Sequence, residues 1–178
     1  MDFVRLLAAR RRVALLFFAL LPIALPLAAE PPREAVVSFG KYGPFRGQEE
    51  VEAGWEFHFE PRRFSFLPRS WPEIVPVAGG MTTGLGTLYA YAGLRADIPL
   101  KERWVLSPTW GTGVYYFADG RDLGGALEFR SGLELSYQLD WGDRIGVCLY
   151  HLSNSAIYRR NPGSESLVLT YTAALRRR

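Results

Sequence analysis

The sequence predicts an eight-stranded antiparallel transmembrane β-barrel that follows an N-terminal export signal. Three observations support this prediction. The chain begins with a basic and then an apolar segment, its remainder repeatedly alternates apolar and polar residues, and aromatic residues gather near the ends of the alternating stretches. Alternation with a period of two separates the two faces of a β-strand, and aromatic girdles are typical of the interfaces of a membrane barrel.

Residues 1–29 have the three regions of a secretory signal peptide. The first twelve residues include four arginines, residues 13–27 are apolar, and the small residues Ala28 and Ala29 follow. An uncleaved anchor helix is the alternative, but two prolines interrupt the apolar run, and the pattern favours an export peptide. We therefore expect cleavage near Ala29 and one mature domain, residues 30–178.

The composition outside this signal excludes several classes of protein. The chain has 21 basic and 18 acidic residues, and four arginines and one aspartate of these lie in the signal, which leaves 17 of each sign. This balance gives no reason to expect a nucleic-acid partner. The single cysteine, Cys148, excludes an intrachain disulfide and fits a small buried residue. The sequence also contains no cluster of metal ligands, and we expect neither a metal nor a cofactor.

The clearest alternation is LEFRSGLELSYQL, residues 127–139. One face carries Leu127, Phe129, Leu133, Leu135, Tyr137 and Leu139, and the other carries Glu128, Arg130, Gly132, Glu134, Ser136 and Gln138. Residues 51–60, VEAGWEFHFE, alternate in the same way. A soluble sandwich would also alternate, with its apolar face inward. The length of the strands, the many charges on their polar faces and the aromatic residues at their ends favour a membrane barrel instead.

Eight stretches of the sequence are candidate strands. They lie at about residues 35–44, 49–60, 72–82, 87–98, 103–116, 125–138, 144–155 and 164–175. An even number of strands after an export signal places both termini in the periplasm. Residues 99–102 and 140–143 are then short periplasmic turns, and residues 118–125 form an outer loop. The segment 61–72, PRRFSFLPRSWP, is too long for a usual periplasmic turn, and the sequence alone does not explain it.

Polar residues interrupt the apolar face of the seventh strand within VCLYHLSNSAIYRRNPGSES, residues 147–166. His151 and Ser153 share a face with Val147, and Glu165 begins the eighth strand, across the outer hairpin. The patch would combine a nucleophilic hydroxyl, a basic imidazole and a carboxylate that orients the imidazole. Asn154 follows the serine, and we expect its amide to donate to an oxyanion. A polar barrel rim without catalytic function is the alternative.

The motifs HLSN and NPGSE, with the glutamate fourteen residues after the histidine, resemble the lipid A 3-O-deacylases of the PagL type. These are eight-stranded outer-membrane barrels with a Ser-His-Glu triad on the lipid-facing surface. The resemblance implies His151 as the general base, Ser153 as the nucleophile, Glu165 as the orienting carboxylate and Asn154 at the oxyanion hole. It also implies hydrolysis of an ester-linked 3-hydroxyacyl chain at the 3-position of lipid A, the anchor of lipopolysaccharide, in the outer leaflet of the bacterial outer membrane.

Several alternatives stay open. Arg159 and Arg160 lie in the outer loop and would either meet lipid A phosphates or be ordinary loop charges. The motif YHLSN also resembles outer-membrane phospholipase A, a twelve-stranded barrel, and a non-catalytic structural or adhesive barrel is a further alternative. The chain ends in TAALRRR, without the terminal aromatic residue that is usual in such barrels. A homodimer is left open.

Overall fold

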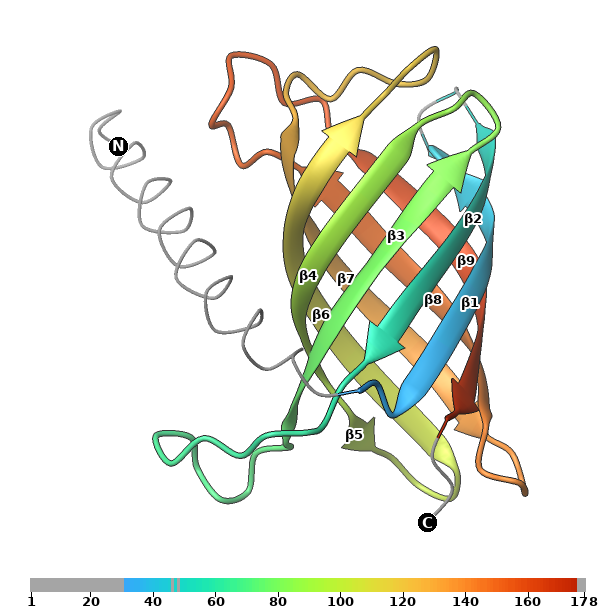
Figure 1. The fold of residues 1–178 in the computed structure, drawn as a ribbon, viewed down its shortest axis with the longest axis vertical. Coiled ribbons are helices and arrows are strands. Elements are labelled where there is room, and N and C mark those ends of the chain that lie inside the picture. Colours follow the sequence, from blue (N-terminus) through green and yellow to red (C-terminus); the bar gives the residue numbers. More distant parts are fainter. Residues whose placement is uncertain (1–30, 46, 48, 176–178) are drawn as a thin grey trace.

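The computed structural model describes residues 31–45, 47 and 49–175, so the expected export signal at 1–29 lies outside the described residues. The described chain is built from β-strands that wrap into a barrel (Figure 1). The strands are β1 (Glu34–Tyr42), β2 (Glu50–His58), β3 (Ile74–Thr83), β4 (Leu88–Ala96), β5 (Ile98–Pro99), β6 (Trp104–Tyr116), β7 (Leu127–Gln138), β8 (Arg144–Ser153) and β9 (Ser164–Ala174).

The sheet closes on itself, because β1 pairs with β9 and β4 pairs with β6. Every pairing among these strands is antiparallel. The two-residue β5 continues β4 past Asp97, since Arg95 and Ile98 face Thr109 and Leu106 of β6 in one register. If β4 and β5 are counted as one, the described residues form eight strands, as predicted. Their bounds lie within two residues of those expected. Closure leaves no unpaired strand edge to face a membrane.

The two faces of the strands divide as the alternation predicts. In β7, Leu133 and Leu135 are exposed on the outer wall, whereas Glu128 and Glu134 are buried in the lumen. In β2, Trp55 is exposed on the outer wall, whereas Glu56 and His58 are buried in the lumen. A wall of exposed leucine, valine and tryptophan around a charged interior is the arrangement of a barrel in lipid, and the reverse of a soluble sandwich. In the described part of the chain, no helix is long and apolar enough to span a membrane.

We call the barrel end that carries residues 34 and 174 the terminal end, and the opposite end, with residues 117–126 and 154–163, the loop end (Figure 1). The lumen towards the terminal end is filled by ion pairs. Arg95 donates to Glu134 (2.5 Å) and Asp97 (2.6 Å), and Arg144 donates to the same Asp97 (2.8 Å). These side chains fill this part of the lumen and pair with one another.

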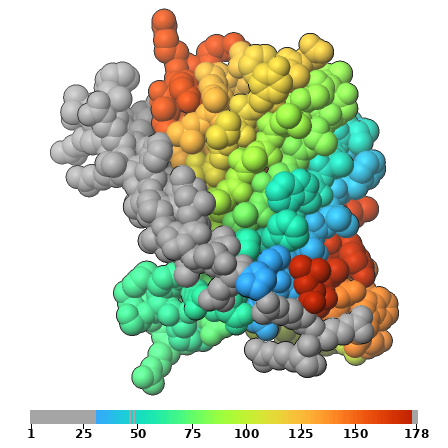
Figure 2. Space-filling model, in the orientation of Figure 1, coloured from blue at the N-terminus to red at the C-terminus, as the bar shows by residue number. Residues whose placement is uncertain are grey.

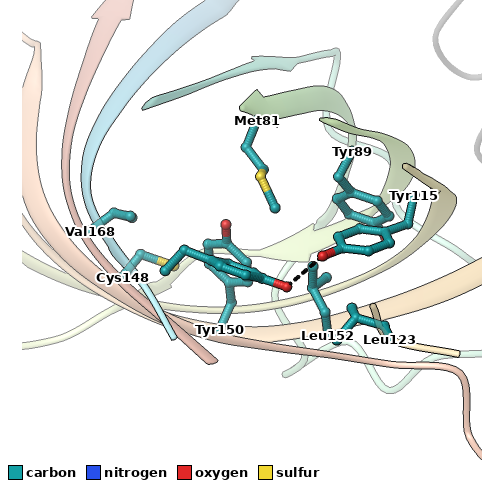
Figure 3. Close-up of a cluster of buried hydrophobic side chains, with 9 residues drawn as sticks. Met81, Tyr89, Tyr115, Leu123, Cys148, Tyr150, Leu152 and Val168 are labelled. Carbon is teal, nitrogen blue, oxygen red and sulfur yellow. Dashed lines mark hydrogen bonds between the residues drawn. The ribbon is translucent and has the colours of Figure 1, made fainter. Parts of the chain in front are cut away.

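Towards the loop end the lumen holds a cluster of buried aromatic and apolar side chains (Figure 3), beside the buried carboxylates of Glu52 and Glu128. The hydroxyls of Tyr42 and Tyr115 are hydrogen-bonded at 2.8 Å, and Leu123 folds down from the outer loop onto the end of the barrel, where it is fully buried. Tyr150 and Leu152 of β8 belong to the same cluster. The core of the molecule is therefore the lumen, and it holds β8 from the inside.

Candidate active site

The interior packing of β8 determines which of its side chains face outward. Tyr150 and Leu152 are buried in the lumen cluster, and the Tyr150 hydroxyl donates to Glu52 across the barrel. Because successive residues of a strand point to opposite faces, the neighbouring His151 and Ser153 must project from the outer wall. Both are partly exposed there, on the face that also presents exposed valine and leucine side chains.

The hairpin between β8 and β9 brings a carboxylate to the imidazole. His151 and Glu165 are direct cross-strand partners, and His151 Nδ1 lies 3.2 Å from Glu165 Oε1. The side chains are 40% and 21% exposed, so the pair lies at the surface of the barrel wall. With Nδ1 turned to the carboxylate, Nε2 is the nitrogen left for proton transfer. The structure thus brings two of the expected site residues together and places Ser153, the last residue of β8, on the same face.

Gly163 lies against this imidazole, although the sequence did not lead us to expect it in the site. It has a left-handed backbone (φ +63°), and a Cβ at this position would lie 2.7 Å from Cε1 and 3.2 Å from Nε2 of His151. Only a glycine combines this backbone conformation with so close an approach. The glycine of the NPGSE motif, just before β9, was the available signal. The missing side chain of Gly163 therefore leaves the space in which the ring of His151 lies.

Asn154 is arranged differently from the expectation. Its side chain is fully buried, and Nδ2 donates to the carbonyls of Leu123 (2.9 Å) and Arg160 (2.9 Å). Its backbone N–H donates to Asn161 Oδ1 at 3.0 Å. The amide that we expected to meet an oxyanion instead ties the outer loop at residues 117–126 to the loop that follows Ser153. Strict strand alternation, which directs residue 154 inward, explains the difference.

A tight turn follows the serine. Ser155 (φ 52°) and Ala156 (φ 60°) both adopt the left-handed conformation, and the Ile157 N–H closes the turn onto the Asn154 carbonyl at 3.0 Å. Two consecutive non-glycine residues in this conformation are strained, and strain of this kind clusters at functional sites. Within the described part of the chain, the N–H groups of Ser155 and Ala156 donate to no acceptor. They are backbone donors close in sequence to the candidate nucleophile.

The two loop arginines differ in their contacts. Arg160 Nη1 forms an ion pair with Asp122 Oδ2 at 2.7 Å, which adds a second tie between the two outer loops. Its side chain nevertheless stays largely exposed. Arg159 is also exposed. Among the described residues, no group of three or more histidine, cysteine or acidic side chains is arranged to hold a metal ion.

A groove runs along the outer wall next to the imidazole. Its upper part has a volume of about 320 Å³, and its lining includes Trp110, Ser131, Gly132, Leu133, Leu149 and His151. A second apolar hollow of about 480 Å³ continues towards the terminal end between Leu135, Val147 and Leu169. Gly132 and Gly146 contribute only backbone to these hollows, since a Cβ at either residue would point into the lumen. From His151 to residue 145 the strand covers about 20 Å at ~3.3 Å per residue, enough to cross one leaflet of a hydrocarbon core of about 30 Å.

Comparison with known proteins bears on this half of the barrel. The family model described as lipid A 3-O-deacylase (PagL) matches residues 99–174. The second half of the chain matches the lipid A 3-O-deacylase family. The match includes the HLSN and NPGSE motifs and therefore confirms the resemblance found in the sequence.

Individual proteins also resemble this chain. The lipid A deacylase PagL of Bordetella bronchiseptica is 36% identical over 74 residues, which cover 40% of this chain and 41% of that protein. The chain thus aligns with less than half the length of this curated relative. The crystal structure of the outer membrane enzyme PagL superposes with a TM-score of 0.58 at 16% identity, covering 80% of this chain and 99% of that one. This superposition confirms the predicted fold class. A structure from the de novo design of transmembrane β-barrels matches with a TM-score of 0.46.

Proposed function

We propose that this protein is an outer-membrane serine esterase that removes an ester-linked 3-hydroxyacyl chain from the 3-position of lipid A. The observation that carries the proposal is the His151–Glu165 pair, 3.2 Å apart on the outer wall, with Ser153 on the same face and strand. This arrangement lies inside the segment that matches the deacylase family. A base held by a carboxylate beside a serine is the arrangement that activates a hydroxyl for attack on an ester.

The reaction would begin at Ser153. As its Oγ attacks the ester carbonyl, Nε2 of His151 takes the hydroxyl proton, and Glu165 stabilises the resulting imidazolium through Nδ1. The tetrahedral intermediate collapses when the imidazolium returns the proton to the 3-oxygen of the sugar, which leaves as an alcohol. The acyl chain is then esterified to Ser153. Water, deprotonated by His151, attacks this acyl-enzyme and releases the 3-hydroxy fatty acid and the free serine.

The developing oxyanion needs hydrogen-bond donors, and we assign them to the turn that follows the serine. The N–H groups of Ser155 and Ala156 point to no protein acceptor in the described chain, whereas the amide of Asn154 already donates to two carbonyls. Asn154 would then act at the oxyanion hole indirectly, because it fixes the loop that presents these backbone donors. Preorganised donors of this kind are worth about 10²–10³-fold in rate each.

The position of the site favours a substrate that is already in the membrane. His151 opens onto an apolar groove on the outer wall, so an acyl chain would reach it from the lipid without leaving the bilayer. The site lies at the loop end of the barrel, where a headgroup would meet the acyl region. Exposed Arg159 and Arg160 are close in sequence and would pair with lipid A phosphates. These features fit lipid A in the outer leaflet of a bacterial outer membrane.

Purified protein in detergent micelles tests this proposal. The wild type is expected to release a 3-hydroxy fatty acid from lipid A, and Ser153→Ala is expected to lose this activity while the barrel keeps its β-type circular dichroism. Ser131→Ala is the informative companion, because Ser131 is the cross-strand partner of His151 on the other side. If Ser131→Ala abolishes hydrolysis and Ser153→Ala does not, the nucleophile is misassigned. Cleavage of phospholipid but not lipid A would favour the phospholipase alternative, and no cleavage of either would favour a structural barrel.

A further inference from the structure

The segment between β2 and β3 has no role in the proposed reaction. We call residues 61–73 the β2–β3 arm. Figure 1 shows it leaving the terminal end of the barrel and extending sideways, beyond the barrel wall. The space-filling view shows the same projection at the lower left (Figure 2). The arm therefore lies beside the barrel mouth, at the level where a membrane around the barrel would end.

The arm is a folded structure. Its base is closed by two backbone hydrogen bonds, from Arg62 N–H to the Ile74 carbonyl (2.8 Å) and from Ile74 N–H to the Arg62 carbonyl (2.9 Å). Two turns follow, closed by the N–H of Leu67 onto Phe64 (3.1 Å) and by the N–H of Trp71 onto Pro68 (3.0 Å). These bonds fix the direction in which the side chains of the arm point.

The side chains presented by this scaffold are aromatic. Phe66 is 77% exposed and Trp71 is 54% exposed. Phe64 packs against Phe66 with ring centroids 5.4 Å apart, which holds the Phe66 ring in place. Exposing large aromatic rings to water is unfavourable, and a closed loop that holds them exposed indicates an apolar or interfacial partner.

The charges on the arm are arranged for an anionic partner. Residues 63–71, its tip, contain Arg63 and Arg69 and no acidic residue. The acidic side chains lie at the base, where Glu60 pairs with Arg33 (3.1 Å) and Glu73 with Arg63 (3.6 Å). The Arg63 guanidinium also donates to the Arg69 carbonyl at 3.1 Å, which ties the two sides of the tip together. The tip thus combines exposed aromatic rings with positive charge.

We propose that the β2–β3 arm binds anionic phospholipids of the inner leaflet, next to the barrel. This inference rests on the proposed placement of the barrel in the outer membrane. Tryptophan favours the interface between headgroups and acyl chains, and arginine pairs with phosphate. The sideways direction of the arm places these groups over the lipids that surround the barrel. The arm would hold the terminal end of the barrel at one membrane–water interface, while the active site lies near the other.

A fluorescent probe on the tip tests this placement. Phe66→Cys, in a chain whose buried Cys148 is replaced by serine, is labelled with an environment-sensitive dye and reconstituted in phosphatidylethanolamine–phosphatidylglycerol vesicles. Asp119→Cys in the outer loop is the matched control, since residue 119 is also exposed. We expect a blue-shifted emission for the label at residue 66, quenched by brominated acyl chains, and a water-like emission for the label at residue 119. The barrel can insert into the vesicle in either orientation without changing the test, because both leaflets have the same lipid composition.

The contribution of charge is tested by changing the lipid headgroup and the arginines of the tip. Replacing phosphatidylglycerol by phosphatidylcholine, or introducing Arg63→Gln with Arg69→Gln, is expected to reduce the blue shift and the quenching. A label at residue 66 that is quenched only by aqueous iodide, as at residue 119, would overturn the proposal. The proposal would also be overturned if the emission of this label did not respond to lipid and the label were protected from iodide only when a soluble periplasmic protein was added. Deacylation is measured on the same vesicles with lipid A added as substrate: activity without lipid quenching refutes the arm alone, and quenching without activity refutes the proposed function alone.

Discussion

The contact between Gly163 and His151 makes a sharp prediction. In Gly163→Ala the new methyl group would lie 2.7 Å from Cε1 of the imidazole, whereas ordinary contacts begin at 3.4 Å. The ring must therefore move by about 0.7 Å, which would change its geometry with Glu165. Since a displacement of about 1 Å in a catalytic group can cost ~10²-fold in rate, we expect kcat to fall by roughly 10- to 100-fold. KM should change little, because the apolar side chains that line the groove are untouched.

The left-handed backbone of Gly163 adds a separate effect on stability. An alanine with positive φ costs about 1–2 kcal/mol whatever surrounds it. Gly47→Ala is the matched control, because Gly47 has a similar φ of +71° but a Cβ there would meet nothing within 4 Å. Steady-state hydrolysis of lipid A in mixed micelles separates the two effects. If Gly163→Ala loses no more kcat than Gly47→Ala, the backbone of Gly163 does not position the imidazole.

Three further variants test other parts of the account. Glu165→Ala should lower kcat less than Ser153→Ala does, because it removes an orienting group and not a reacting one; equal losses would contradict this. Leu149→Trp places a bulky indole ring in the outer groove and should raise KM for lipid A, while the free energy of unfolding in urea stays the same. An unchanged KM would mean that the substrate does not use the groove. Arg95→Met removes the ion-pair partner of buried Glu134 and one of the two arginines that pair with Asp97, and should destabilise the barrel by about 3–5 kcal/mol in urea unfolding, with kcat unchanged in the folded fraction.

The barrel could be predicted from the sequence because its determinants are local. In β7 the alternation of leucine with glutamate is enough to identify a strand and to assign its faces. The proximity of His151 and Glu165 follows from two local facts, the outward parity of both residues and the hairpin between them. Hydrophobic alternation therefore predicts the wall of the barrel, and together with the hairpin it predicts the His151–Glu165 pair on its surface.

The loops could not be predicted in this way, because their contacts join residues far apart in the sequence. The amide of Asn154 is occupied by the carbonyl of Leu123, about thirty residues earlier, and Arg160 is paired with Asp122. No periodic pattern indicates such contacts. The role of Gly163 depends on a close approach that only coordinates reveal. The direction of the β2–β3 arm likewise depends on backbone hydrogen bonds at its base.

The most direct test of the central claim is mass spectrometry of lipid A from bacteria that express this protein. If the protein is a lipid A 3-O-deacylase, cells with the wild type contain lipid A lighter by one 3-hydroxyacyl chain, lost from the 3-position. Cells with Ser153→Ala, expressed at the same level in the outer membrane, should contain the full-length lipid A only. Lipid A that is equally deacylated in both strains would contradict the assignment of Ser153, and lipid A that is unchanged with a folded wild-type barrel would contradict the proposed function.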